Sequence, residues 1–177
     1  MYILMLQVLM PPAGPRYTTQ SGLVRFTSDA PLELIEARSS VLRGVLDTSQ
    51  HSFAFAVQLS SFEGFNDPLQ AEHFCEKFLE CERYPQATFS GKIIESVPFG
   101  QPGVYEVRAK GTFVVHGVSR ERIIKGSLTI AEDGIRVRSD FTVRLGDHAI
   151  RVPQVVFHNV AEAIAVHIDA TLVATGS

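Results

Sequence analysis

The chain has 177 residues, enough for one sizeable hydrophobic core but short for two, so a single domain is expected. Its composition, 45% hydrophobic and 20% charged, is that of a globular protein and excludes both a disordered chain and one embedded in a membrane. A net charge of −3, from 16 Lys and Arg against 19 Asp and Glu, comes with no basic stripe, so nucleic acid is not an expected partner.

Residues 1–16 form a segment of their own. The first ten are almost wholly apolar, and the PPAGPR that follows breaks helix and strand alike. Such a run is too short to cross a bilayer, so no stable membrane span is expected, but it matches the apolar core of an export signal. The basic start and the cleavage site of such a signal are missing. An incomplete export signal and an apolar arm packed on the domain both remain open, and the domain itself is expected to span residues 17–177.

Alternating apolar residues predict short strands in the first part of the chain. Such alternation gives a strand one apolar face and one wet face. Two segments show it, the first around Val24 and Phe26, the second with Phe53, Phe55, Val57 and Leu59.

A helix is predicted to begin after Asp67. This side chain can cap the first turn, Pro68 suits the first helical position, and Gln70 stands where the partner of a capping box reaches back. Tyr84-Pro85 is expected to end the helix, because the residue before a proline avoids the α conformation. Spacings of i, i+3, i+4 and i+7 give the helix one apolar stripe, formed by Ala71, Phe74, Cys75, Phe78 and Leu79.

The same segment concentrates His73, Cys75 and Cys81, which raises the question of a metal site. His73 and Cys81 are about two helical turns apart, and about 600° of rotation separates the two cysteines, which places them on opposite sides of a helix. Such a set cannot hold one ion without further ligands. Two cysteines six residues apart also make no disulfide framework. The pattern therefore favours small apolar side chains buried on an amphipathic helix, and no metal is expected.

The second half of the chain alternates more strongly, over 105–115, 124–130, 135–145 and 164–172. With a further strand beginning near residue 87, roughly eight short strands are expected. Tight connections between them favour an all-β fold with one short helix, built as an antiparallel barrel or sandwich. The turns are predicted at Gly117, Glu132-Asp133-Gly134 and Gly146-Asp147.

No motif for catalysis stands out. The sequence contains no G-x-S-x-G, S-x-x-K, P-loop or G-x-G-x-x-G, and its six His residues are scattered. His73 on the helix and His116 at a hairpin corner are the two with the most suggestive positions. A lipid-modifying enzyme that uses a cavity His as its base is kept as an alternative, to be recognised by a carboxylate within hydrogen-bond reach of that His.

The predicted interior mixes large and small residues. Ala109 and Gly111 stand next to Phe113, and Gly126 stands next to Leu128 on the same parity. An eight-stranded barrel can be filled by its own side chains or can hold one ligand, and the pattern leaves both open. A filled barrel would favour a third function, a protein-interaction module that binds its partner through an exposed edge strand.

Three stretches carry a resemblance to a known family: EHF-x3-FLE-x3-YP-x-ATF-x-GKI at 72–93, KGTFVVHGVSR at 110–120 and IRVPQVVF at 150–157. In order and spacing they resemble the YceI-like isoprenoid-binding proteins over about residues 17–174. The resemblance implies a lipocalin-like antiparallel eight-stranded barrel with a helix on one side. It departs at 66–69, where many members carry Arg-Asp or Asn-x-x-Met, so no headgroup contact is carried over from this loop.

The resemblance implies a non-enzymatic carrier that holds a long isoprenoid lipid, a polyprenyl phosphate or a prenylated quinone, in an internal apolar tunnel. Because many members are exported, a periplasmic or secreted location is implied as well. No cofactor is expected besides the bound lipid, and a homodimer could share a tunnel mouth or an edge. The predicted headgroup donors are His73, Tyr84 and His116, and the predicted lining is Phe55, Phe74, Phe78, Phe89, Tyr105, Phe113, Leu128, Phe141 and Val143.

Overall fold

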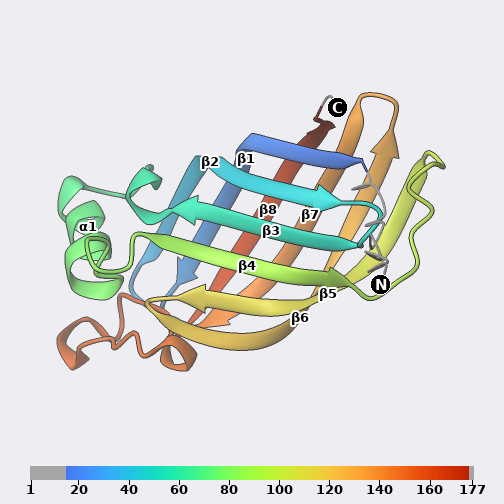
Figure 1. Cartoon of the computed structure of the whole chain (residues 1–177). Coiled ribbons are helices and arrows are strands. Elements are labelled where there is room, and N and C mark those ends of the chain that lie inside the picture. Colours follow the sequence, from blue (N-terminus) through green and yellow to red (C-terminus); the bar gives the residue numbers. More distant parts are fainter. Residues whose placement is uncertain (1–14, 176–177) are drawn as a thin grey trace, which may run out of the picture.

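The computed structural model describes residues 15–175, so most of the predicted N-terminal segment, residues 1–14, lies outside the described part. The described residues fold into one closed antiparallel barrel in which the strands follow one another in chain order and β1 pairs with β8 (Figure 1). This confirms the eight strands and decides between the barrel and the sandwich. The strands are β1 (Arg16–Asp29), β2 (Leu34–Asp47), β3 (Ser52–Gln58), β4 (Gln86–Ile93), β5 (Gly103–Val115), β6 (Val118–Ala131), β7 (Gly134–Arg144) and β8 (Ala163–Ala174).

The alternation in the second half of the chain places side chains as predicted. Along β5, Val107, Gly111, Phe113 and Val115 are buried, while the residues between them are exposed or partly exposed. The β5–β6 hairpin turns at His116 and Gly117, with φ of 53° and 70°. Two successive residues with positive φ are what a two-residue hairpin with the natural strand twist requires, and glycine adopts this conformation without strain.

Strand β2 has no counterpart among the strands that the alternation predicts. Its pattern is obscured because a small polar residue, Ser39, points inward and is 1% exposed, whereas Val41 is exposed. The Ser39 hydroxyl is satisfied by a 2.7 Å hydrogen bond with the hydroxyl of Ser61. Register shifts in the β1–β2 pairing around Gly22 further disturb the period of two.

The two ends of the barrel differ. One end, called here the helical end, carries the connections 30–33, 59–85 and 145–162 together with the β5–β6 turn, and Figure 1 shows α1 beside it. Its helices are η1 (Leu59–Ser61), α1 (Pro68–His73), the single π turn η2 (Phe74–Phe78), η3 (Leu145–His148) and η4 (Gln154–Val156).

The opposite end is packed. Ile135 and Leu172 pair across β7 and β8 and are both 0% exposed. Leu46, Ile130 and Val97 belong to the same buried cluster. Ile135, Leu172, Ile130 and Val97 fill the barrel at the end away from α1.

The start of the helix is confirmed, and its end differs from the prediction. The Asp67 carboxylate accepts a 2.9 Å hydrogen bond from the Gln70 amide, and Pro68 occupies the first turn. The α-helix ends at His73, one π turn follows, and Glu80 then adopts a left-handed conformation with φ of 50°. The chain therefore turns back at Glu80, four residues before Tyr84-Pro85.

Candidate functional site

A cavity of about 630 Å³ occupies the interior of the barrel. Its wall extends from the helical end to Leu46, Phe53 and Ile93, which stand near the opposite ends of their strands. All eight strands, α1, η2 and the segment 145–160 contribute to its wall, and the wall is overwhelmingly apolar. Its volume falls within the roughly 300–1,000 Å³ of known ligand pockets. The small residues Ala109 and Gly126 both line it, so the interior is hollow where the mixture of large and small residues left the question open.

The structure brings nine of the twelve predicted site residues to this cavity. Strand residues form most of the set, and three residues come from α1 and η2. Their contact with a ligand stays a prediction. The nine are Phe55, His73, Phe74, Phe78, Phe89, Phe113, Leu128, Phe141 and Val143.

Tyr105, Tyr84 and His116 do not line the cavity. Tyr105 lies near the start of β5, at the packed end, and its hydroxyl donates a 2.9 Å hydrogen bond to the Gln101 carbonyl. Tyr84 packs edge-on against the His116 ring, with 5.0 Å between ring centroids. Alternation and sequence proximity to the helix could not separate these positions from the lining, because neither gives the height of a residue along the barrel.

His116 instead joins the segment after the helix to the barrel. Its Nε2 lies 2.5 Å from a Glu80 carboxylate oxygen, and its Nδ1 lies 3.0 Å from the His148 carbonyl. The side chain of His148 is buried and contacts the Val118 carbonyl through Nδ1 at 2.9 Å. These contacts hold the turn at Glu80 and the η3 segment against the β5–β6 hairpin.

Four phenylalanines cover the cavity at the helical end. Phe74 stacks on Phe26 with 5.3 Å between ring centroids, and Phe62 and Phe65 each pack against both rings. All four line the cavity. Sequence reasoning identified Phe74 alone. Phe62 and Phe65 lie in the irregular segment between η1 and α1, where no period marks the inward face.

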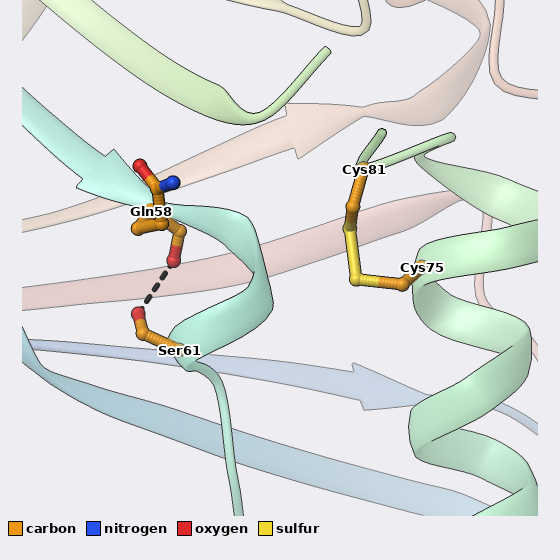
Figure 2. Close-up of a disulfide and its surroundings, with 4 residues drawn as sticks. All are labelled: Gln58, Ser61, Cys75 and Cys81. Carbon is orange, nitrogen blue, oxygen red and sulfur yellow. Dashed lines mark hydrogen bonds between the residues drawn. A yellow bond between two sulfur atoms is a disulfide. The ribbon is translucent and has the colours of Figure 1, made fainter. Parts of the chain in front are cut away.

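The prediction for the cysteines is wrong, because Cys75 and Cys81 form a disulfide (Figure 2). The prediction assumed a continuous helix, whereas the π turn and the left-handed Glu80 bring Cys81 back beside Cys75. The Cys81 amide donates a 2.9 Å hydrogen bond to the Cys75 carbonyl, and the two Cα atoms are 4.9 Å apart. The disulfide closes a short loop directly behind Phe74 and Phe78. Figure 2 also shows the Ser61 hydroxyl, which donates to the Gln58 carbonyl at 2.5 Å.

A polar network joins three connections at the helical end. The Glu33 carboxylate accepts hydrogen bonds from the side chains of Asn66, Gln70 and Asn159, and so ties three connections together. Glu33, Gln70 and Asn159 also line the cavity. This network fixes the rim of the cavity around its aromatic cover.

The geometry expected of a cavity His acting as a base is not met in the described part of the chain. His73 lines the cavity but pairs with no carboxylate there. Within residues 15–175 the His–carboxylate pairs are Glu80 with His116 and Asp140 with His167, and none of these four residues lines the cavity. Within residues 15–175, no group of three or more His, Cys, Asp or Glu side chains is placed to bind a metal ion.

A comparison with protein families decides the family. The model of the YceI-like domain matches residues 23–172, most of the chain. The chain belongs to the YceI-like family. No curated protein matches the sequence.

The YceI-like barrel is also similar to solved structures at low sequence identity. A polyisoprenoid-binding domain from Saccharophagus degradans superposes with a TM-score of 0.78 at 15% identity, covering 90% of this chain and 98% of that one. BcnA of Burkholderia cenocepacia superposes with a TM-score of 0.69 at 16% identity, covering 87% of this chain and 96% of that one. A YceI protein of Campylobacter jejuni superposes with a TM-score of 0.62 at 13% identity, covering 80% of this chain and 85% of that one. These likenesses confirm the YceI-like fold. Among the helices of the described residues, none has the length and apolarity needed to cross a membrane.

Proposed function

We propose that the protein is a non-enzymatic carrier that holds the chain of a long isoprenoid-type lipid, a polyprenyl phosphate or a prenylated quinone, in the barrel cavity. The observation that carries the proposal is the hollow of about 630 Å³ with its apolar wall. Family membership and the Saccharophagus degradans polyisoprenoid-binding domain support it.

The physical reason is the transfer of hydrocarbon from water into this wall. Each buried methylene contributes about 0.8 kcal/mol, so a prenyl chain gains enough free energy without any directed contact. The aromatic cover over the cavity, with Phe26 and Phe74 at its centre, adapts to a branched chain through its ring faces and edges.

We extend the proposal to the compartment. Disulfides persist in oxidising surroundings such as the bacterial periplasm, and the Cys75–Cys81 bond supports a periplasmic or secreted location. The protein-interaction alternative required a filled interior and an exposed edge strand. The interior is not filled, because the barrel encloses a cavity. A homodimer that shares the mouth of the cavity stays a prediction.

The test is the lipid content of the purified protein. Organic extraction followed by mass spectrometry is expected to yield a prenyl lipid at close to one molecule per chain. The delipidated protein is expected to take up a prenylated quinone. A lipid-free extract combined with a failure to take up the quinone would contradict the proposal.

A pair of variants provides the control. Ala109 lines the cavity, whereas Ala54 on β3 is exposed and does not line it. Ala109→Phe is expected to fold and to bind the long prenyl chain more weakly, because the new ring occupies part of the hollow. Ala54→Phe adds the same ring outside the barrel and is expected to leave uptake unchanged.

A further inference from the structure

The barrel is closed, but β6 and β7 pair along only part of their length. Their ladder runs from Ala131↔Gly134 to Ser127↔Arg138 and stops there. The next contact is a side-chain bond, in which the Ser139 hydroxyl donates to the Lys125 carbonyl at 2.7 Å. From this point to η3, a gap without backbone pairing separates β6 from β7 on the helical side of the barrel.

Arg122 bridges this gap. It shares the parity of Ile124 and Leu128, which point into the barrel, and its partner on β5 is Gly111, which has no side chain to obstruct it. Its guanidinium carbon lies 5.7 Å from the centre of the Phe113 ring and 5.5 Å from the centre of the Phe141 ring. The cation therefore extends from β6 over two rings of the cavity wall, one on β5 and one on β7.

The donors of this guanidinium have no protein partner among the described residues. Arg122 is partly buried, and its side chain makes no hydrogen bond or ion pair with any residue in the range 15–175. Burial lowers the pKa of Arg122 below its usual value, and attraction by Asp147 acts in the opposite direction. Arginine nevertheless stays charged at neutral pH, so five N–H donors and a full positive charge stand at the gap.

The polar side chains around the gap favour binding of an anion, and one acidic residue, Asp147, opposes it. Lys125, Ser127 and Ser139 line the cavity at the same gap. Asp147 is the acidic residue that attracts Arg122. Its backbone carbonyl accepts a 2.9 Å hydrogen bond from the Arg120 side chain. A ligand anion is thus offered a cation with free donors beside an apolar cavity, which is the arrangement that an amphiphile with an acidic head requires.

The geometry points to Arg122 as the headgroup site for a phosphate carried by the bound lipid, with the hydrocarbon chain in the cavity and the phosphate in the gap between β6 and β7. This inference rests on the proposed function and narrows its ligand from isoprenoid lipids in general to those with an anionic head. Planar guanidinium donors bind phosphate oxygens in pairs, which an ammonium group does not reproduce.

The experiment compares three probes on the delipidated full chain: a polyprenyl monophosphate, the uncharged polyprenol of the same length, and inorganic phosphate. The wild-type protein is expected to bind the monophosphate at least about tenfold more tightly than the alcohol. Arg122→Gln is expected to remove most of this preference and to leave polyprenol affinity unchanged, which also shows that the barrel is intact. Arg122→Lys is expected to recover part of it. Arg43→Gln, which alters an exposed arginine on β2, serves as the matched control.

The outcomes separate this inference from the proposed function. If the wild-type protein binds the polyprenyl monophosphate and the polyprenol equally, the headgroup site is wrong while the hydrocarbon cavity stands. The same holds if Arg122→Gln keeps the preference for the monophosphate. If inorganic phosphate binds as tightly as the polyprenyl monophosphate, and only when Arg122 is present, Arg122 is a site for a free anion and the lipid-headgroup inference is wrong. If neither lipid binds, the proposed function is wrong and this inference falls with it.

Discussion

The hollow inside the barrel predicts unequal losses of stability when two isoleucines are truncated. Ile135 on β7 is fully buried at the packed end and does not line the cavity, whereas Ile168 on β8 lines it and is partly exposed. Truncation to alanine removes about three carbon groups from each, a transfer contribution of about 2.4 kcal/mol when they are fully buried. Ile135→Ala also leaves a new cavity among packed neighbours, so a total loss of about 3–5 kcal/mol is expected.

Ile168→Ala enlarges a space that already exists. The atoms on its cavity side have few contacts to lose, so a loss of about 1–2 kcal/mol in the free energy of unfolding is expected. Urea unfolding of the delipidated protein, followed by circular dichroism, gives both values from the shift in midpoint at constant slope. Equal losses in the two variants would mean that the interior around Ile168 is packed as tightly as the far end, and the reasoning from the hollow would fail.

Three further predictions concern residues outside the cavity wall. Replacing Cys75 and Cys81 by serine is expected to leave the thermal midpoint of the barrel nearly unchanged. Amide exchange over residues 74–84 is expected to become roughly thirtyfold faster, which corresponds to about 2 kcal/mol for a loop of this length. Unchanged exchange would contradict this prediction. Hydrogen bonding from Arg136 lowers the pKa of Asp169 from 3.8, so this pair stabilises the fold above that value and the effect is lost as pH falls through the lower folded pKa. Asp169→Asn should therefore reduce the unfolding free energy at neutral pH by less than about 1 kcal/mol, and an equal reduction at a pH below the folded pKa would refute the assignment. Gly117→Ala forces a side chain into positive φ against the Tyr84 ring, and chemical denaturation should show a loss of about 1–2 kcal/mol, which a neutral result would exclude.

The strands of the second half of the chain were predictable because their inward and outward faces follow a strict period of two. The pattern along β5 is the clearest case, since only Val114 departs from it. Strand β2 was not predicted, because the inward position of Ser39 depends on a hydrogen bond with Ser61, twenty-two residues away in sequence. A partner so distant leaves no mark on the local pattern.

The site was predictable in kind but only partly in position. Parity identified rings such as Phe89 and Phe113 that line the cavity, but it gave no height along the barrel and so could not separate them from Tyr105. The disulfide was missed because its geometry depends on a left-handed residue, Glu80, that breaks the helical phase. Arg122 was missed because a charged residue on an inward parity is ordinarily expected to point to solvent.

The measurement that tests the central claim most directly is the affinity of the delipidated protein for uncharged polyprenols of increasing length. Each isoprene unit that enters the cavity adds up to about 4 kcal/mol, at roughly 0.8 kcal/mol for each buried carbon group. Affinity is therefore expected to rise with each unit until the cavity of about 630 Å³ is filled, and then to level off. Ala109→Phe is expected to level off at a shorter chain. Affinity that does not depend on chain length, or that rises equally in Ala109→Phe, would contradict the account.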